Sequence, residues 1–465
     1  MNVGRALLAA WVVGLAGCSL VHEQEPPVLP VAERWRESTD DEAQLPPWRV
    51  MFADVELQGL IEQALEHNRE VLLAVLRIDE VRALHGVAWA DQWPALGINA
   101  GTQRRGVSAL DSPSGQSLVR EQGHFRLGLT AFELDLWGRV RALREAAGQR
   151  LAASREDVLS AQLGLVGEVA ATFYEYLANV ELGGQSQASL EQARAAARLI
   201  GRRQALGLAN ELELRQADAL VLSLEAELAQ TQRELSLSLN RLELLVGAAV
   251  DGDRLAGRAG DTSSMLSEVA PGLPSDLLLR RPDIRAAEAR LRAFNAHIGA
   301  ARAAFLPSIS LTGLFGLSSP QLGQLFSGQA REWSFSPQLD LPLFDMGRRF
   351  SQLDLSRAQR EIALVEYQRV IQQAFREVAD ALGSNRPLAA RLAAQQRLVD
   401  NEARRAELAQ RLYEGGLSSY LEVLDARRGL NSARQTLVRV RLSQTTNRIA
   451  LYKSLGGGWP SVAPE

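Results

Sequence analysis

The sequence predicts a mixed α and β chain, mainly α, that carries two β-hairpins and consists of two similar halves. Long stretches rich in Ala, Leu, Arg, Glu and Gln contain few internal glycines or prolines, as helices require. Residues 94–137 and 307–344 instead alternate apolar and small polar side chains, with the period of two that is typical of strands. Matching motifs recur at a nearly constant spacing, which indicates an internal duplication.

The chain begins with a segment of the kind that directs export. Arg5 precedes an apolar run, residues 6–14, that is too short to span a bilayer. Leu-Ala-Gly then leads to Cys18, the only cysteine. This is the bacterial lipobox pattern, so we expect residues 1–17 to be a lipoprotein signal peptide and Cys18 to carry a covalent lipid. A signal peptide with an incidental cysteine is the alternative.

The residues after Cys18 indicate the target membrane. An Asp at the next position favours retention in the inner membrane, and this chain has Ser19, so we expect sorting to the outer membrane. Residues 18–50 are polar and contain prolines, which is typical of an extended tether to the lipid. No later stretch has the roughly 18 apolar residues that a membrane helix needs, so a membrane crossing would require strands.

Six segments are expected to be helical. They are residues 52–90, 139–203, 211–246, 274–304, 348–413 and 419–455. A helix of about 65 residues would be roughly 100 Å long. Such lengths predict coiled-coil packing rather than a compact core.

Each alternating window is expected to be two strands joined by a polar loop. The loops are predicted at residues 104–121 and 318–332. Strands of about ten residues with one apolar face are typical of transmembrane barrels, although a soluble hairpin packed on helices fits the same pattern.

The duplication sets the expected domain boundaries. Pro94 and Pro307 precede the hairpins and lie 213 residues apart, and Gly207 and Gly416 lie 209 apart. The expected boundaries are a first repeat over 51–250, a linker over 251–273, a second repeat over 274–456 and a tail over 457–465. Four strands cannot close a barrel and open edges are not viable in lipid, so membrane hairpins would require an oligomer. A trimer would supply twelve strands.

Composition excludes several classes of function. A formal charge of -4 and a pI near 5.9 argue against a nucleic-acid footprint. The only lysine, Lys453, follows Tyr452, so no Walker A loop is present. The five histidines form no local metal pair, and no nucleophile elbow occurs. We therefore expect neither an enzyme nor a metal site, and no cofactor besides the lipid on Cys18.

Several motifs together resemble the outer membrane factor (TolC/OprM) family, and especially its NodT-type efflux lipoproteins. The most specific is Gly-Leu-Pro-Ser-Asp-Leu-Leu at 272–278, followed by Arg-Arg-Pro-Asp-Ile-Arg-Ala-Ala-Glu at 280–288. Further motifs occur in the expected order at 305–308, 344–348, 420–426 and 451–459. With the lipobox and tether, the resemblance covers nearly the whole chain.

The resemblance implies a homotrimer with a twelve-stranded transmembrane β-barrel, four strands per chain, continuous with a long periplasmic α-helical barrel. It implies a passive outer-membrane channel of a tripartite efflux pump, anchored by lipid and extending into the periplasm. The implied partners are a periplasmic adaptor (membrane fusion protein), an inner-membrane RND-type transporter and outer-membrane lipid. The cargo would be drugs or other small molecules.

Other functions stay open. The same channel type can serve metal-ion export or type I protein secretion, because the inner-membrane partner selects the cargo. A lipoprotein enzyme would need a pocket with perturbed acids or a nucleophile, and none is indicated. A coiled-coil scaffold would explain the helices but not the duplicated hairpins. The neighbouring genes would separate the transport alternatives.

The resemblance also implies a gate at the periplasmic tip. In the family, the corresponding positions narrow the aperture with an apolar ring, an acidic ring and polar links between helices. Carried over to this chain, the gate residues are Leu421 (apolar), Asp425 and Glu422 (acidic), and Arg428 and Tyr413 (links). Some members carry a basic link residue where this chain has Ser418. Spacing alone favours an ordinary exposed helix with an Asp–Arg pair, and the resemblance favours the gate.

A structural role is expected for Arg281, Pro282 and Asp283. Proline at the start of a helix costs nothing, because the missing N–H would be unpaired there. An acid in the first turn suits the positive end of the helix dipole.

Overall fold

The computed structural model describes residues 45–257 and 281–458. Cys18, Ser19 and most of the expected tether and linker lie outside these ranges. The described residues belong to two compact units. One, here called the sheet unit, contains Arg77–Arg155 and Ala286–Tyr367; the other, the helix unit, contains the described parts of Leu29–Leu76, Glu156–Arg285 and Gln368–Glu465.

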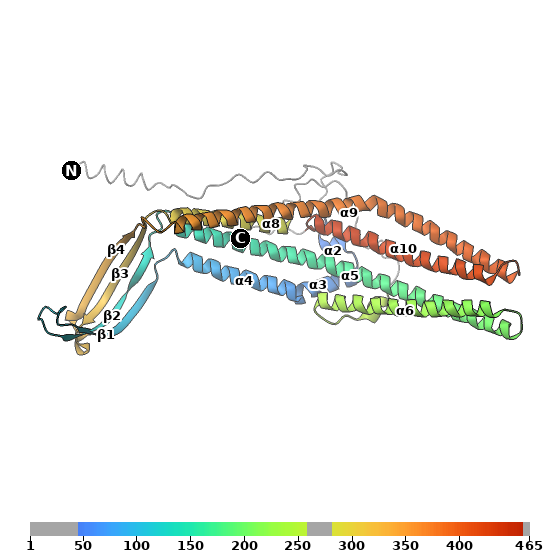
Figure 1. Ribbon diagram of the computed structural model, residues 1–465, viewed down its shortest axis with the longest axis horizontal. Coiled ribbons are helices and arrows are strands. Elements are labelled where there is room, and N and C mark those ends of the chain that lie inside the picture. The colour runs from blue at the N-terminus through green and yellow to red at the C-terminus, as the bar shows by residue number, and fades with distance from the viewer. Residues whose placement is uncertain (1–44, 258–280, 459–465) are drawn as a thin grey trace. The chain divides into compact units, whose positions relative to one another are not determined.

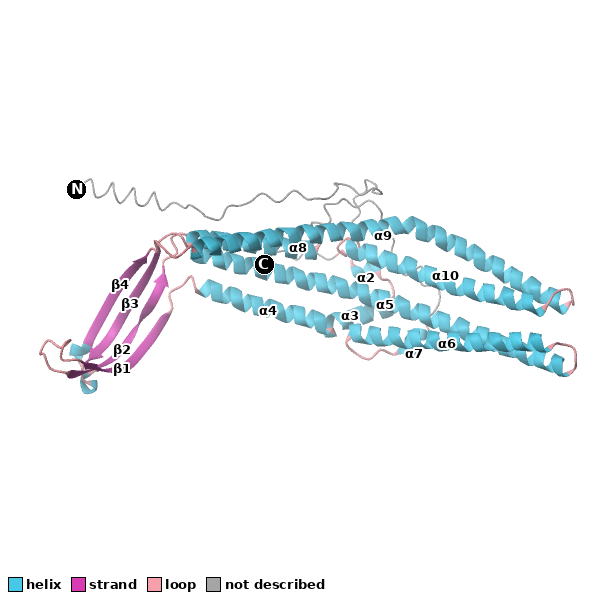
Figure 2. Ribbon diagram, viewed as in Figure 1, coloured by secondary structure: helices cyan, strands magenta, loops and turns pink. Residues whose placement is uncertain are grey.

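Helices make up most of the described chain, as the composition predicts (Figure 2). They are α2 (Trp48–Met51), α3 (Val55–His67), α4 (Arg69–Ala90), α5 (Arg139–Ala205), α6 (Glu211–Val246), α7 (Gly252–Ala256), α8 (Pro282–Ala303), α9 (Arg348–Glu414) and α10 (Tyr420–Ser454). Both α5 and α9 have 67 residues, close to the expected length. Within the described ranges, no helix combines the length and the apolar character needed to cross a membrane.

The two hairpins form one antiparallel sheet in the order β1-β2-β3-β4 (Figure 1). Its strands are β1 (Leu96–Val107), β2 (Leu118–Glu133), β3 (Ser308–Ser319) and β4 (Arg331–Asp340). The expected loops at 104–121 and 318–332 were too long, because strand pairing continues to Val107↔Leu118 and Leu317↔Arg331. Polar residues at the strand ends hid this continuation.

The alternation expected through Ala131 is interrupted. The register of β2 against β3 shifts between Leu129 and Phe132, and Ala131 has a φ of 51°. Its N–H donates to Oγ1 of Thr312 at 3.1 Å. The extra residue is a β-bulge, which bends the strand locally.

One face of the sheet is apolar and exposed in the single chain. Large side chains on this face are Leu96, Ile98, Phe125, Leu127, Phe315, Trp333, Phe335 and Leu339. The other face has Asn99, Gln103, Gln122, Arg126, Ser308, Ser310, Ser318, Ser334 and Ser336. Strand alternation therefore separates apolar from polar residues over most of the sheet, except near the β1–β2 loop, where Arg104 and Glu121 lie on the apolar face and Val107 and Leu118 on the other.

The helix expected over 52–90 was wrong in two respects, since it begins only at Val55 and is divided at Asn68. The Asn68 side chain accepts from the N–H of Glu70 and Val71 at 3.0 and 3.2 Å and so caps α4. Its amide nitrogen donates to the carbonyl of Leu245 at 2.9 Å. The residues on both sides of Asn68 have the composition of a continuous helix. Composition therefore did not reveal that α3 ends and α4 begins at this capping asparagine.

The core of the helix unit gathers the N-terminal helices around α5 and the end of α10. Phe52 and Tyr452 are fully buried and meet edge to face at 5.8 Å. The Tyr452 hydroxyl lies 3.1 Å from the Pro46 carbonyl and 2.7 Å from that of Gly457. Trp48 belongs to the same core. The last residues of the expected tether are therefore part of the folded unit.

Candidate functional site

The turn between α9 and α10 repeats the geometry of the turn between α5 and α6. In each, a glycine takes a left-handed φ, 71° at Gly207 and 73° at Gly416. The next N–H then reaches back to a carbonyl of the last turn, Leu208 to Arg203 at 2.8 Å and Leu417 to Leu412 at 2.9 Å. This is the Schellman arrangement, which ends a helix sharply and favours glycine. Each long helix pair is thereby closed into a hairpin (Figure 1).

Three of the predicted gate residues, Leu421, Glu422 and Asp425, lie on one groove of the α9–α10 hairpin. The groove has a volume of ≈ 790 Å³. It is lined by Asn401, Arg404, Arg405, Leu408, Ala409, Leu412, Leu421, Glu422 and Asp425. Leu421 is 54% exposed although it is apolar. The structure thus places an apolar residue beside two acids on one groove.

Asp425 is paired with a residue that sequence reasoning missed. Its carboxylate binds the Arg405 guanidinium, which also donates to Glu402 at 3.1 Å. The hydrogen bond to Asp425 and, to a lesser degree, that to Glu402 raise the pKa of Arg405 above its ordinary value. Arg428, the partner suggested by spacing along one helix, is exposed and forms no ion pair with any described residue. Arg405 lies across the hairpin, so helix spacing could not reveal it.

Ser418 and Glu422 form a second polar contact at the tip. The Ser418 hydroxyl donates to Oε2 of Glu422 at 2.6 Å. The contact joins the connection between α9 and α10 to the first helical turn of α10. The tip therefore holds this acid with a neutral hydroxyl.

Tyr413 lies away from the groove and joins the two helical hairpins. Its hydroxyl accepts from Nη1 of Arg203 at 2.8 Å, and that guanidinium also stacks 5.4 Å from the ring centre. The ring packs on Tyr420 at 5.3 Å. Burial, and to a lesser degree nearby Tyr413, raise the pKa of the Tyr420 hydroxyl, whereas Arg427 opposes the rise. Sequence reasoning identified Tyr413 as a link but not its partner Arg203.

Arg281 is held by three segments of the helix unit. Its guanidinium donates to both oxygens of Asp283 at 3.0 and 2.7 Å, to Glu377 of α9 at 3.0 Å and to the Ser454 carbonyl at 2.8 Å. The side chain is 9% exposed. Pro282 begins α8, as predicted. The motif therefore joins the start of α8 to α9 and to the end of α10.

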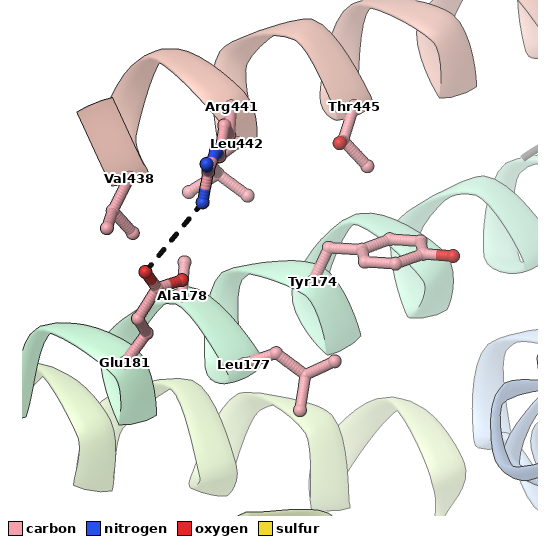
Figure 3. A pocket seen from close by; sticks show the side chains of 8 residues that line it. All are labelled: Tyr174, Leu177, Ala178, Glu181, Val438, Arg441, Leu442 and Thr445. Atoms are coloured by element: carbon pink, nitrogen blue, oxygen red, sulfur yellow. Dashed lines mark ion pairs between the residues drawn. The ribbon is translucent and has the colours of Figure 1, made fainter. Parts of the chain in front are cut away.

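The helix unit also contains a cleft that is too small to hold a substrate. A cleft between α5 and α10 has a volume of only ≈ 20 Å³, with Glu181 and Arg441 4.0 Å apart at its edge (Figure 3). That is room for about one water molecule. Among the described residues, no group of three or more potential ligands could bind a metal ion.

Comparison with known proteins identifies the family. Residues 60–248 and 273–457 match the family described as outer membrane efflux protein. The chain belongs to this family. Two relatives come from Pseudomonas putida: the antibiotic efflux pump outer membrane protein ArpC and the toluene efflux pump outer membrane protein TtgC. Each is 40% identical to this chain over 97% of this chain and 95% of its own length. The open-state structure of the Neisseria gonorrhoeae MtrE outer membrane channel is 32% identical and superposes with a TM-score of 0.83, covering 95% of this chain and 98% of that one.

The family assignment confirms the expected fold class, function and location. The chain is an outer-membrane channel component of an efflux pump. The long helical hairpins and the small sheet are the elements of the outer membrane efflux protein fold. The two matched stretches each contain one hairpin of the sheet and one helical hairpin.

Proposed function

We propose that three copies of this outer membrane efflux protein form one channel through the outer membrane. The observation that carries this proposal is the open sheet. The edges of the sheet, β1 and β4, have no partner strand among the described residues, and one face is largely apolar and exposed. Unpaired edges are not tolerated in lipid, and four strands are too few to close. Three sheets joined edge to edge give a closed barrel of twelve strands, with the apolar face toward lipid.

The efflux protein then serves as the passive outer part of a tripartite pump. A periplasmic adaptor and an inner-membrane RND-type transporter would supply energy and cargo, since the sequence contains no Walker A motif for nucleotide binding. ArpC and TtgC are named for antibiotic and toluene efflux, which supports drugs and other small molecules as the cargo. Metal-ion export and type I protein secretion are the alternatives.

The groove of α9 and α10 is proposed as the gate. Leu421 would form an apolar ring and Asp425 with Glu422 an acidic ring around the threefold axis. Three like charges at about 6 Å repel by roughly 3 kcal/mol per pair at an effective dielectric near 20. Arg405 on the same chain supports the closed arrangement, because its charge offsets part of this repulsion. Arg428 and Tyr413 are proposed as links to neighbouring helices.

Asp425→Ala is expected to lower the cation preference of the channel at least about twofold, because it removes the acidic ring. Arg405→Ala should shift the preference in the opposite direction, since Asp425 then lacks its compensating cation. Asp425→Ala/Arg428→Ala should increase conductance further by loosening the tip. Single-channel currents and reversal potentials in planar bilayers measure all three. If the variants conduct with the same single-channel current and the same reversal potential as the wild type, these residues are ordinary surface charges. If the wild type itself shows no unitary currents, the proposal of a channel is refuted.

We also propose that Cys18 is acylated and anchors the mature chain in the outer membrane. The lipobox before Ser19 supports this. Wild-type protein should incorporate labelled palmitate, and Cys18→Ala should lose at least about nine-tenths of the label, because no other cysteine exists. Equal labelling of the two proteins would refute the anchor. Membrane association itself should survive the substitution, since the barrel is a second attachment.

A further inference from the structure

Two arginines of the sheet unit directly face each other near the loop end of β1 and β2. Arg105 and Arg120 are Cα partners in a register that is unbroken from Leu96↔Leu129 to Val107↔Leu118. Side chains alternate between the two faces along each strand, and Leu96 and Leu129 lie on the apolar face. Arg105 and Arg120 are each an odd number of residues away from these leucines, so both lie on the polar face. Like charges in directly opposed strand positions destabilise a sheet. The pair therefore has an energetic cost that a bound anion would remove.

The other two arginines of β1 and β2 have carboxylate partners. Arg104 pairs with Glu121 at 3.0 Å, and Arg126 with Glu332 at 2.9 Å. Arg105 and Arg120 are exposed and form no ion pair with any residue in the described ranges. Within the described ranges, no carboxylate neutralises the positive charges of Arg105 and Arg120.

The surroundings of the pair contain no acid on the same face. The flanking positions on that face are the neutral pairs Gln103↔Gln122 and Val107↔Leu118. Asp111, the acid of the β1–β2 loop, closes a local turn with the Ser108 hydroxyl at 3.1 Å. Two guanidinium groups thus remain available in a small neutral patch. Guanidinium presents planar, paired donors that match the oxygens of phosphate, sulfate and carboxylate.

We propose that Arg105 and Arg120 form an oxyanion-binding site on the pore side of the barrel, near its loop end. This inference rests on the proposed function, in which the apolar face meets lipid and the polar face lines the pore. The ligand class is a soluble phosphate-, sulfate- or carboxylate-bearing solute. Three copies place six guanidinium groups around the outer mouth, opposite in sign to the acids proposed at the tip. An anionic solute would be drawn toward the exit, and a multivalent one would be held there.

The test uses tripolyphosphate as a blocker of single-channel current in planar bilayers without lipopolysaccharide. Wild-type channels should be blocked at the lowest concentration when the probe is added on the side of the loops. Arg105→Gln/Arg120→Gln should need at least about tenfold more probe, since two charged donors are lost. The matched control is Arg104→Gln, which removes an adjacent arginine from the opposite face and should match the wild type. Isothermal titration of the detergent-solubilised protein gives the same comparison without a conducting channel.

The outcomes separate the site from the proposed function. Equal block, or equal titrated affinity, in the wild type and the double variant overturns the site while leaving the channel intact. An absence of unitary currents together with arginine-dependent binding in the titration refutes the channel and supports the site. Repeating the block with lipopolysaccharide in the outer leaflet tests the source of the anion. Unchanged block supports a soluble ligand, whereas loss of block shows that lipid phosphates occupy the pair and overturns its placement in the pore.

Discussion

Arg281→Met is expected to destabilise the efflux protein by about 3 kcal/mol, because it breaks a buried, multiply bonded ion pair. The substitution leaves Asp283 and Glu377, which are 32% and 28% exposed, without their shared cation. It also leaves the Ser454 carbonyl at the end of α10 without the donor that now binds it at 2.8 Å. Arg281→Lys should recover only part of the loss, since an ammonium cannot reproduce the fork that reaches three partners. The measurement is the midpoint of thermal or denaturant unfolding in detergent, followed by helical circular dichroism.

The control for this prediction is Arg292→Met, in helix α8, which begins directly after Arg281. Arg292 pairs with Glu288 at 2.6 Å, four residues earlier, and its side chain is 60% exposed. Such surface pairs contribute a few tenths of a kcal/mol, so the midpoint should barely move. If Arg281→Met and Arg292→Met shift the midpoint equally, the buried network has no special role in stability.

Local patterns predicted the helices and turns well. Helical composition placed both ends of α6 and the start of α9, and the glycines at 207 and 416 marked the two sharp helix ends. These features depend on backbone preferences within a few residues, which one sequence displays directly. The division at Asn68 was missed because its amide is fixed by the carbonyl of Leu245, far along the chain.

The candidate site was predicted only in part, for a similar reason. Spacing along one helix predicted that Leu421, Asp425 and Arg428 share a face, and the structure places Leu421 and Asp425, but not Arg428, on the groove. The partner of Asp425 could not be found this way, because Arg405 approaches from the other helix of the hairpin. Likewise, Tyr413 was recognised but Arg203, in the other half of the chain, was not. Contacts between helices depend on packing geometry, and spacing within one helix carries no information about it.

Gly316→Ala is expected to abolish assembly of the sheet into trimers, because β2 and β3 pack too closely there for any side chain. A Cβ at Gly316 would lie 2.2 Å from the Phe125 carbonyl oxygen and 2.6 Å from the Cα of Arg126. These are backbone atoms, so relief requires separating the strands that join the two hairpins. The yield of trimer on unheated denaturing gels, relative to total protein, should fall at least about tenfold, which corresponds to about 1.4 kcal/mol.

Gly313→Ala is the matched control, three residues earlier in β3. A Cβ at that position meets nothing closer than the Leu129 side chain at 3.9 Å, an ordinary van der Waals contact. Both variants replace a strand glycine by alanine, so they share any effect on backbone entropy. Normal trimer from Gly313→Ala and none from Gly316→Ala would locate the requirement in the close approach of β2 and β3. Equal trimer yields from the two variants would show that this approach is not what limits assembly.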